Sequence, residues 1–297
     1  MPKKDRIFVL HGYTTVAEAD RAFYQSYDAL FLARKVELLY EMYRNSTAIL
    51  AASQGWERPI GSVEEELRTL LATELHCTVF HQTEAVIALL LAEYQDKPDW
   101  VYLTTYGNAE IKEAASAIAN NQSIPRTTAS GMKDLVKTAV YARFDLSKIS
   151  EVAAQWERSI SSIISLLQII SEQFIDAHEY NSYKHGLRVV LGSASLGVAQ
   201  GDLADQKIAI VSSMRHAMTF LQLERLKDGD GAQMVTKQVI PEYSSEVVRC
   251  LASLASTIKS FRLARINGAP PDEMLFPVFD TVLLDRIKPV SKFGISY

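Results

Sequence analysis

From residue 17 to residue 51 the chain contains neither glycine nor proline and is rich in alanine, leucine, glutamate and arginine, all strong helix formers. This run predicts one long helix, or two if the chain bends within it. A second run, from Ser62 to about Tyr94, has Ser62 and Glu65 at the spacing of a capping box and stops before Lys97-Pro98. Two helices of this length favour a fold whose body is a multi-helix bundle.

Further helices are predicted along the chain. Short ones are expected near 108–119 and 130–143. A cap at Asp145 or Ser147 then begins a helix whose apolar residues recur at steps of three and four, as on the buried face of an amphipathic helix. These residues are Val152, Trp156, Ile160, Ile163, Leu167, Ile170 and Phe174. Pro241 starts a C-terminal helix that ends before Gly268, and its aligned apolar residues are Val247, Leu251, Leu254, Ile258 and Phe261.

Between these helices, after Gly186, the sequence changes character. Short runs rich in β-branched residues, bounded by glycine and aspartate, predict a small antiparallel β meander near 187–240. The expected fold is therefore mainly α (α+β): a multi-helix bundle with a small meander and a C-terminal helix. We expect a single domain, 1–297, with a helical body at 1–186, the meander at 187–240, and the C-terminal helix and tail at 241–297.

Charge and cysteine content exclude several classes of protein. The 31 basic and 35 acidic residues give a net charge of −4 and a pI near 5.9, which argues against a protein that coats nucleic acid or anionic membranes. The two cysteines, Cys77 and Cys250, form no CxxC motif, so disulfide frameworks and cysteine-rich zinc sites are disfavoured. The longest apolar run, 85–92, is far shorter than the ~20 residues of a membrane-spanning helix. We expect a cytoplasmic protein with no membrane partner.

Polar residues follow the apolar face of the helix that contains Phe174. If that helix continues to Gly186, then His178, Asn181 and His185 lie at roughly +40°, −20° and +20° from Phe174 around its axis. Their side chains would face inward, where a buried polar group needs a partner. Gly186 would then end the helix as its C′ residue.

The same angular reasoning finds polar residues on the inner faces of the two N-terminal helices. Glu74 and His81 fall near Leu67, and Arg34 falls near Phe23. Our hypothesis is that six side chains converge on one polar pocket, in which an arginine pairs with a glutamate and histidines have shifted pKa values. These pocket residues are Arg34, Glu74, His81, His178, Asn181 and His185.

Four interpretations of the polar helix end stay open. Histidine and asparagine near a helix end commonly cap carbonyl groups, and this structural role ranks first. A pocket for a small molecule or nucleotide ranks second, a catalytic site third and a metal site last. His178 and His185 would lie about 10 Å apart along the helix, too far to share one ion. We therefore predict no metal and no cofactor.

The segments "ELHCTVFHQTEAVIALLLAE", "WVYLTTYGNAE" and "YNSYKHGLRVV" resemble a group of uncharacterised bacterial helical proteins with an Asn-x-x-Lys-His-Gly helix end. The chain is more distantly similar to HEPN helical domains, a resemblance that implies a dimer and an endonuclease site with a histidine acid or base. The HEPN nuclease signature is an arginine, then four to six residues of any type, and then the histidine. Residues 178–180, before His185, are His, Glu and Tyr, so only Asn181, Lys184 and His185 carry over as catalytic candidates.

Two function classes follow. The first is a non-enzymatic ligand-binding or protein-interaction module whose partner is a small molecule or a protein, with a homodimer as one arrangement. The second is a HEPN-like, metal-independent RNase or nucleotide-processing enzyme, and only this one has nucleic acid as its partner. Exposure of His185 separates them, because a general acid or base must be reached by substrate.

Overall fold

The computed structural model describes residues 15–52, 60–95, 97–177, 180, 183, 189–200, 207–226, 229–271, 273–280 and 292–296. Contacts divide the chain into two compact units. Unit 1 comprises Met1–Leu30, Glu84–Ser171 and Ser253–Asp280, and unit 2 comprises Phe31–Thr83, Glu172–Ala252 and Thr281–Tyr297. Three long helices, α4, α8 and α10, each contribute a part to both units. The single-domain organisation expected for 1–297 stays a prediction.

In its described part, unit 1 is built from helices. Its own elements are α1 (Val16–Ser26), α5 (Asp99–Thr105), α6 (Asn108–Ala119), α7 (Met132–Leu135), a π-helical turn η1 (Val136–Val140) and a 3-10 turn η2 (Leu146–Lys148). To these it adds residues 84–92 of α4 (Ile60–Ala92), 150–171 of α8 (Ser150–Ile175) and 253–267 of α10 (Pro241–Asn267). The unit has a large apolar core, which includes Ile87, Leu90, Ile111, Ile118, Tyr141, Trp156, Ile163, Leu254, Ile258 and Phe261.

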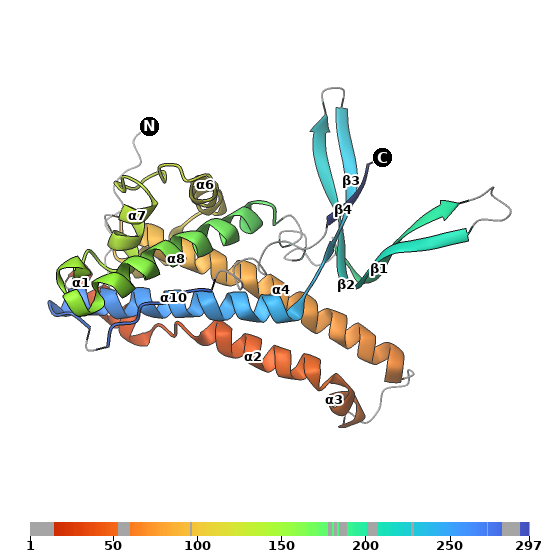
Figure 1. The fold of residues 1–297 in the computed structure, drawn as a ribbon, viewed down its shortest axis with the longest axis horizontal. Coiled ribbons are helices and arrows are strands. Elements are labelled where there is room, and N and C mark those ends of the chain that lie inside the picture. Colours follow the sequence, from red (N-terminus) through yellow and green to blue (C-terminus); the bar gives the residue numbers. More distant parts are fainter. Residues whose placement is uncertain are drawn as a thin grey trace. The chain divides into compact units, whose positions relative to one another are not determined.

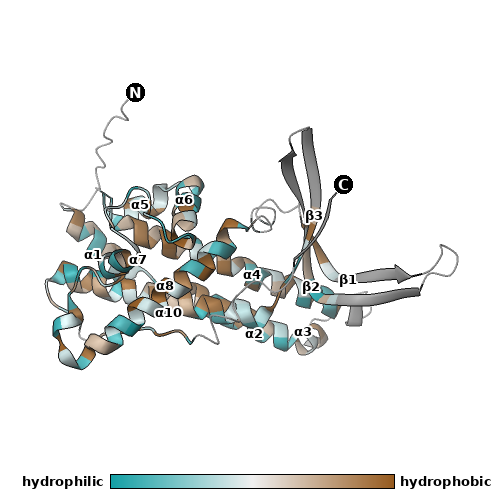
Figure 2. Ribbon diagram, turned by 45° about the horizontal axis from the view of Figure 1, so that its top comes forward, coloured by the Kyte–Doolittle hydropathy of each residue, from teal (hydrophilic) through white to brown (hydrophobic). Residues whose placement is uncertain are grey.

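The mainly helical fold with a small antiparallel sheet is confirmed. The apolar stripe predicted from Val152 to Phe174 is buried from Trp156 onward, and the stripe of α10 is buried throughout. Hydrophobic stretches of α4, α8 and α10 are brown in Figure 2. α10 ends at Asn267 as predicted, because Gly268 takes a positive φ of 72° and its N–H donates to the Arg265 carbonyl at 3.1 Å.

Unit 2 joins helices to the sheet. It contains α2 (Phe31–Arg44), α3 (Ser46–Ala52), residues 60–83 of α4, the end of α8 and residues 241–252 of α10. Four described strands form an antiparallel sheet in the order β1-β2-β3-β4: β1 (Val189–Gln200), β2 (Lys207–Leu226), β3 (Gly229–Gln238) and β4 (Lys292–Ser296). The meander predicted near 187–240 is thus present, and the C-terminal tail adds a fourth strand to it.

The long strand β2 takes part in two β-ribbons. Its residues 207–216 lie against β1, residues 221–226 lie against β3, and only 217–220 have partners on both sides. Figure 1 shows the two ribbons leaving the shared segment in different directions. Met218 and Phe220 of the shared segment are buried together with Val235 of β3, so the sheet is anchored where three strands meet.

The first long helix predicted, 17–51, is in fact three: α1, α2 and α3. The break after α1 comes from hydrogen bonds that helix propensity does not describe. Tyr27 leaves the helix with ψ at 118°, its carbonyl accepts from Lys259 Nζ at 2.6 Å, and Asp28 Oδ1 accepts from the Leu30 N–H at 3.1 Å. Such an Asx turn offers the backbone an alternative to the helix. The second helix is close to prediction, since α4 begins two residues before Ser62 and ends two before Tyr94.

The helix predicted to run to Gly186 was also wrong, because α8 ends at Ile175. Ala177 N–H donates to the Phe174 carbonyl at 3.3 Å, which tightens the last turn. Lys237 of β3 donates from Nζ to the Asp176 carbonyl at 2.7 Å and lies 3.3 Å from its Oδ2. A lysine from the sheet thus satisfies the helix end that we expected a glycine to close. His178, Asn181, Lys184 and His185 lie outside the described residues.

Within the described part of the chain, one helix is long and apolar enough to cross a membrane by length and composition, namely Val63–Ala92 within α4. Most of its apolar window is buried inside the molecule. Most of its apolar side chains are therefore packed against other parts of the chain, although Leu70 is exposed.

Candidate functional site

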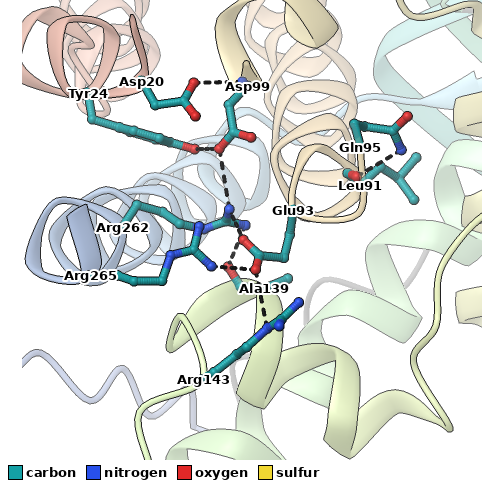
Figure 3. Close-up of polar contacts among 10 residues, drawn as sticks. All are labelled: Asp20, Tyr24, Leu91, Glu93, Gln95, Asp99, Ala139, Arg143, Arg262 and Arg265. Atoms are coloured by element: carbon teal, nitrogen blue, oxygen red, sulfur yellow. Dashed lines mark hydrogen bonds and ion pairs between the residues drawn. The ribbon is translucent and has the colours of Figure 1, made fainter. Parts of the chain in front are cut away.

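The largest group of buried charges in the described chain centres on Arg262 in α10 (Figure 3). Its Nη1 contacts Glu93 and lies 3.3 Å from Oδ2 of Asp99, while Nη2 donates to the Ala139 carbonyl at 3.2 Å. The side chains of Arg262 and Glu93 are only 1% and 2% exposed. Both carboxylates come from one short connection, since Glu93 follows α4 and Asp99 begins α5 after Pro98.

Further polar groups surround this ion pair. Tyr24 donates its hydroxyl to Asp99 Oδ2 at 2.6 Å, and Asp20 Oδ1 accepts the Asp99 N–H at 2.7 Å. Arg265 and Arg143 both contact Oε1 of Glu93, Arg143 at 3.5 Å. Three arginines thus face three carboxylates, Glu93, Asp99 and Asp20, and the formal charges of the cluster cancel (Figure 3).

Burial shifts the pKa values of several of these groups. Burial raises the pKa of Asp20 to about 6, and the nearby charge of Asp99 adds to the rise. Burial also raises the pKa of the Tyr24 hydroxyl well above its usual value, so Tyr24 stays a hydrogen-bond donor. Although burial alone would lower the pKa of Arg262, the negative charges of Glu93, Asp99 and Asp20 raise it, and its guanidinium stays charged.

This Arg262 cluster is built to hold unit 1 together. A substrate cannot reach a guanidinium and carboxylate that are almost fully buried and already paired, whereas acid–base catalysis requires contact with the reacting group. The cluster connects α1, the α4–α5 connection, η1 and α10, which are far apart in sequence. Its role is structural.

A second polar group, in unit 2, centres on His216 of β2. The buried ring lies between two hydroxyls, with Nε2 at 2.9 Å from Tyr43 Oη and Nδ1 at 3.2 Å from Thr69 Oγ1. The guanidinium of Arg68 lies 5.2 Å from the centre of the Tyr43 ring. Burial lowers the pKa of His216, so at neutral pH the ring is uncharged and its two nitrogens join β2 to α2 and α4.

Two residues of the predicted pocket belong to a third group, at the α2–α4 contact of unit 2. Glu74 Oε1 lies 2.5 Å from Lys35 Nζ, and its Oε2 accepts a hydrogen bond from Tyr183. Burial alone would raise the pKa of Glu74, but these hydrogen bonds and the charges of Lys35 and His81 lower it. The His81 ring packs edge-on against Tyr180, with ring centres 5.1 Å apart.

Convergence of the six pocket residues stays a prediction. The described residues place Glu74 and His81 in the same part of unit 2, whereas Arg34 is exposed on α2 and Lys35 forms the expected ion pair. The angular prediction for Arg34 was measured from Phe23 along one continuous helix. Because the chain breaks between Ser26 and Phe31, the direction of every later side chain changes.

An exposed apolar surface lies beside the Lys35–Glu74 pair. Phe31, Leu38 and Met42 of α2 are 63%, 68% and 39% exposed, and Leu70 of α4 is 49% exposed. Leu38 and Met42 lie within about 20° of Phe31 around the α2 axis, so the three form one stripe. α2 and α4 run antiparallel, because Lys35 pairs with Glu74 and Tyr43 accepts a hydrogen bond from Arg68. Leu38 follows Lys35 by three residues and Leu70 precedes Glu74 by four, so both lie about one turn from the ion pair in the same direction along the helices. We call these four residues the α2 patch.

The sequence reasoning missed Arg262, Asp99, Glu93, His216 and the α2 patch. An arginine on an otherwise apolar helix face was a usable signal, since Arg262 lies within about 40° of Leu251 and Ile258 around the predicted helix axis. Nothing local indicates its partners. Among residues that the structure describes, no group of three or more histidine, cysteine, aspartate or glutamate side chains is arranged to hold a metal ion.

No protein-family model, curated protein or solved structure matches this chain. The resemblances to bacterial helical proteins and to HEPN domains therefore stay predictions.

Proposed function

We propose that this protein is a non-enzymatic protein-interaction module of the cytoplasm that binds its partner through the α2 patch. The observation that carries the proposal is the exposure of four large apolar side chains on two neighbouring helices. Single exposed leucines are common on protein surfaces, but a group of large apolar side chains rimmed by charges is typical of an interaction site. Phenylalanine, leucine and methionine supply the area that a partner would bury.

The buried polar groups also support the proposal, because they already have partners within the protein. Arg262 and its carboxylates are enclosed and paired, and both ring nitrogens of His216 have hydroxyl partners. These groups are used in packing and are poor candidates for chemistry. A cytoplasmic location agrees with two buried cysteines, Cys77 and Cys250, that form no disulfide, since disulfides are rare in a reducing compartment.

Site-specific photo-crosslinking in cells tests the proposal. A photoreactive phenylalanine analogue replaces Leu38 in the patch, and a matched control places it at Glu37, an exposed residue of α2 outside the stripe. We expect a discrete crosslinked product from position 38 and none from position 37. The absence of a product at 38, or equal products at both positions, would contradict the proposal.

An alternative proposal is a HEPN-like, metal-independent RNase or nucleotide-processing enzyme. It draws on Asn181, Lys184 and His185, the three residues that carry over from that family. Cleavage of a generic RNA in the presence of a chelator tests it. The alternative requires activity in the wild type that is lost in His185→Ala.

A further inference from the structure

We infer that the partner bound by the α2 patch is a second copy of this chain, whose α2 packs antiparallel against the first around a two-fold axis near Leu38. The inference rests on the proposed function and names its partner. It follows from the arrangement of charges beside the apolar stripe.

The flank of the stripe carries opposite charges at its two ends. Arg34 and Glu41 lie on the same side of α2, at about −60° and −80° from Phe31 around the axis, and seven residues apart. Both are exposed. Glu41 also lies near Arg44, with an Nη1 to Oε1 distance of 3.4 Å, and its Oε2 accepts a hydrogen bond from Asn45 Nδ2 at 3.1 Å. Exposed contacts of this kind are weak and exchange readily.

This pattern is self-complementary in only one direction. When two identical helices pack antiparallel, the same flank of each faces the other in reverse order, so Arg34 meets Glu41 of the partner subunit. The reverse contact forms by symmetry, as a two-fold interface requires. In a parallel pair, opposite flanks would meet, and Arg34 would approach Lys35 of the partner subunit, placing like charges together. Antiparallel packing thus joins the stripes and satisfies the charges at once.

The dimensions of the α2 patch predict a modest affinity between the two copies. The stripe from Phe31 to Met42 is about 16 Å long, and Leu70 widens it on one side. Two such faces bury less than the roughly 800 Å² per partner of a standard stable interface. We therefore expect a concentration-dependent dimer with micromolar affinity.

Sedimentation velocity of the purified full-length protein tests the inference, from about 1 to about 200 µM, a range that brackets a small interface. The wild type is expected to move from monomer to dimer across this range. Leu38→Glu is expected to stay monomeric, and Glu37→Gln, outside the stripe, is expected to behave as the wild type. Circular dichroism melting checks that each variant is folded. We expect each of them to fold, because the substituted side chains are exposed.

A charge exchange tests the antiparallel arrangement. Arg34→Glu and Glu41→Arg each place like charges across the interface, so each alone is expected to weaken the dimer about tenfold. An equimolar mixture restores both opposite-charge contacts and is expected to form a heterodimer. A mixture that stays monomeric would overturn the inference.

The two proposals fail in different ways. A wild type that stays monomeric throughout the range, while position 38 crosslinks in cells to a different protein, overturns self-association and leaves the interaction module standing. A monomeric wild type without any crosslinked product at position 38 overturns both.

Discussion

Lys35 Nζ lies 2.5 Å from Oε1 of Glu74, and this ion pair joins α2 to α4. Ala33 and Val36 are buried, whereas Phe31, Leu38 and Met42 on another face are exposed. A helix that is apolar on its packed face needs no second apolar face for its own stability, so the exposed stripe is best explained by a partner.

Substitutions of two neighbouring arginines in the Arg262 cluster are expected to lower the free energy of unfolding by very different amounts. Arg262→Met leaves the almost fully buried Glu93 without its closest charge partner, which is expected to lower the free energy of unfolding by about 3 to 5 kcal/mol. Arg265→Met removes a second contact to Glu93 from a side chain that is 39% exposed, and is expected to cost less than about 1 kcal/mol. Urea denaturation measures both. Equal losses would show that burial does not govern this cluster.

Replacing Asp20 with an uncharged residue is expected to increase the stability of the fold in a pH-dependent way. Its folded pKa of about 6 exceeds its ordinary value of 3.8, so the folded state binds more protons between these values and stability falls as pH rises through them. Asp20→Asn keeps an oxygen that can accept the Asp99 N–H. We expect it to be more stable than the wild type above pH 6, on the order of 1 kcal/mol after allowance for partial exposure, and equally stable below pH 4. Melting curves at both pH values decide the matter, and a difference independent of pH would refute this account.

His216 predicts a loss of stability in acid. Because burial lowers its folded pKa below 6.5, the unfolded chain binds more protons as pH falls through 6.5, and folding becomes less favourable. The groups whose charges act on the ring are Glu65, Arg215, Arg68 and Glu242. His216→Gln is expected to reduce the loss between pH 7 and pH 5. Melting curves at pH 7 and pH 5 measure the loss, and an equal loss in the wild type and the variant would contradict this account.

The native thiols are expected to be inert. Cys77 and Cys250 are both buried, and burial raises the pKa of Cys250 to about 11, so little thiolate forms at neutral pH. A thiol reagent is expected to label neither residue in the folded protein and both in urea. Rapid labelling of the native chain would contradict the packing around α4 and α10.

Much of the fold was predictable from periodicity because long helices in this chain are buried along one face. The sequence indicates this burial directly, because the apolar residues recur at steps of three and four. They run from Trp156 to Phe174 in α8 and from Val247 to Phe261 in α10. Their boundaries were harder to predict. α1 breaks where Lys259 binds the Tyr27 carbonyl, and α8 ends where Lys237 binds Asp176; both lysines are remote in sequence.

The Arg262 cluster and the α2 patch were less predictable than the helices, because their members are also remote from one another in sequence. Arg262 follows Glu93 by more than 160 residues, and no local pattern indicates that the two meet. The α2 patch was hidden by the expectation of one continuous helix from residue 17. Once α2 is known to begin at Phe31, the steps of seven and four to Leu38 and Met42 identify the stripe.

The most direct test of the central claim, that a protein covers the α2 patch, is the reactivity of a cysteine placed there in living cells. Leu38→Cys and the control Glu37→Cys are labelled with a membrane-permeant maleimide, against native thiols that are buried. The account predicts several-fold slower labelling at position 38 than at position 37 in cells, and similar rates in dilute purified protein. Equal rates at the two positions in cells would contradict it.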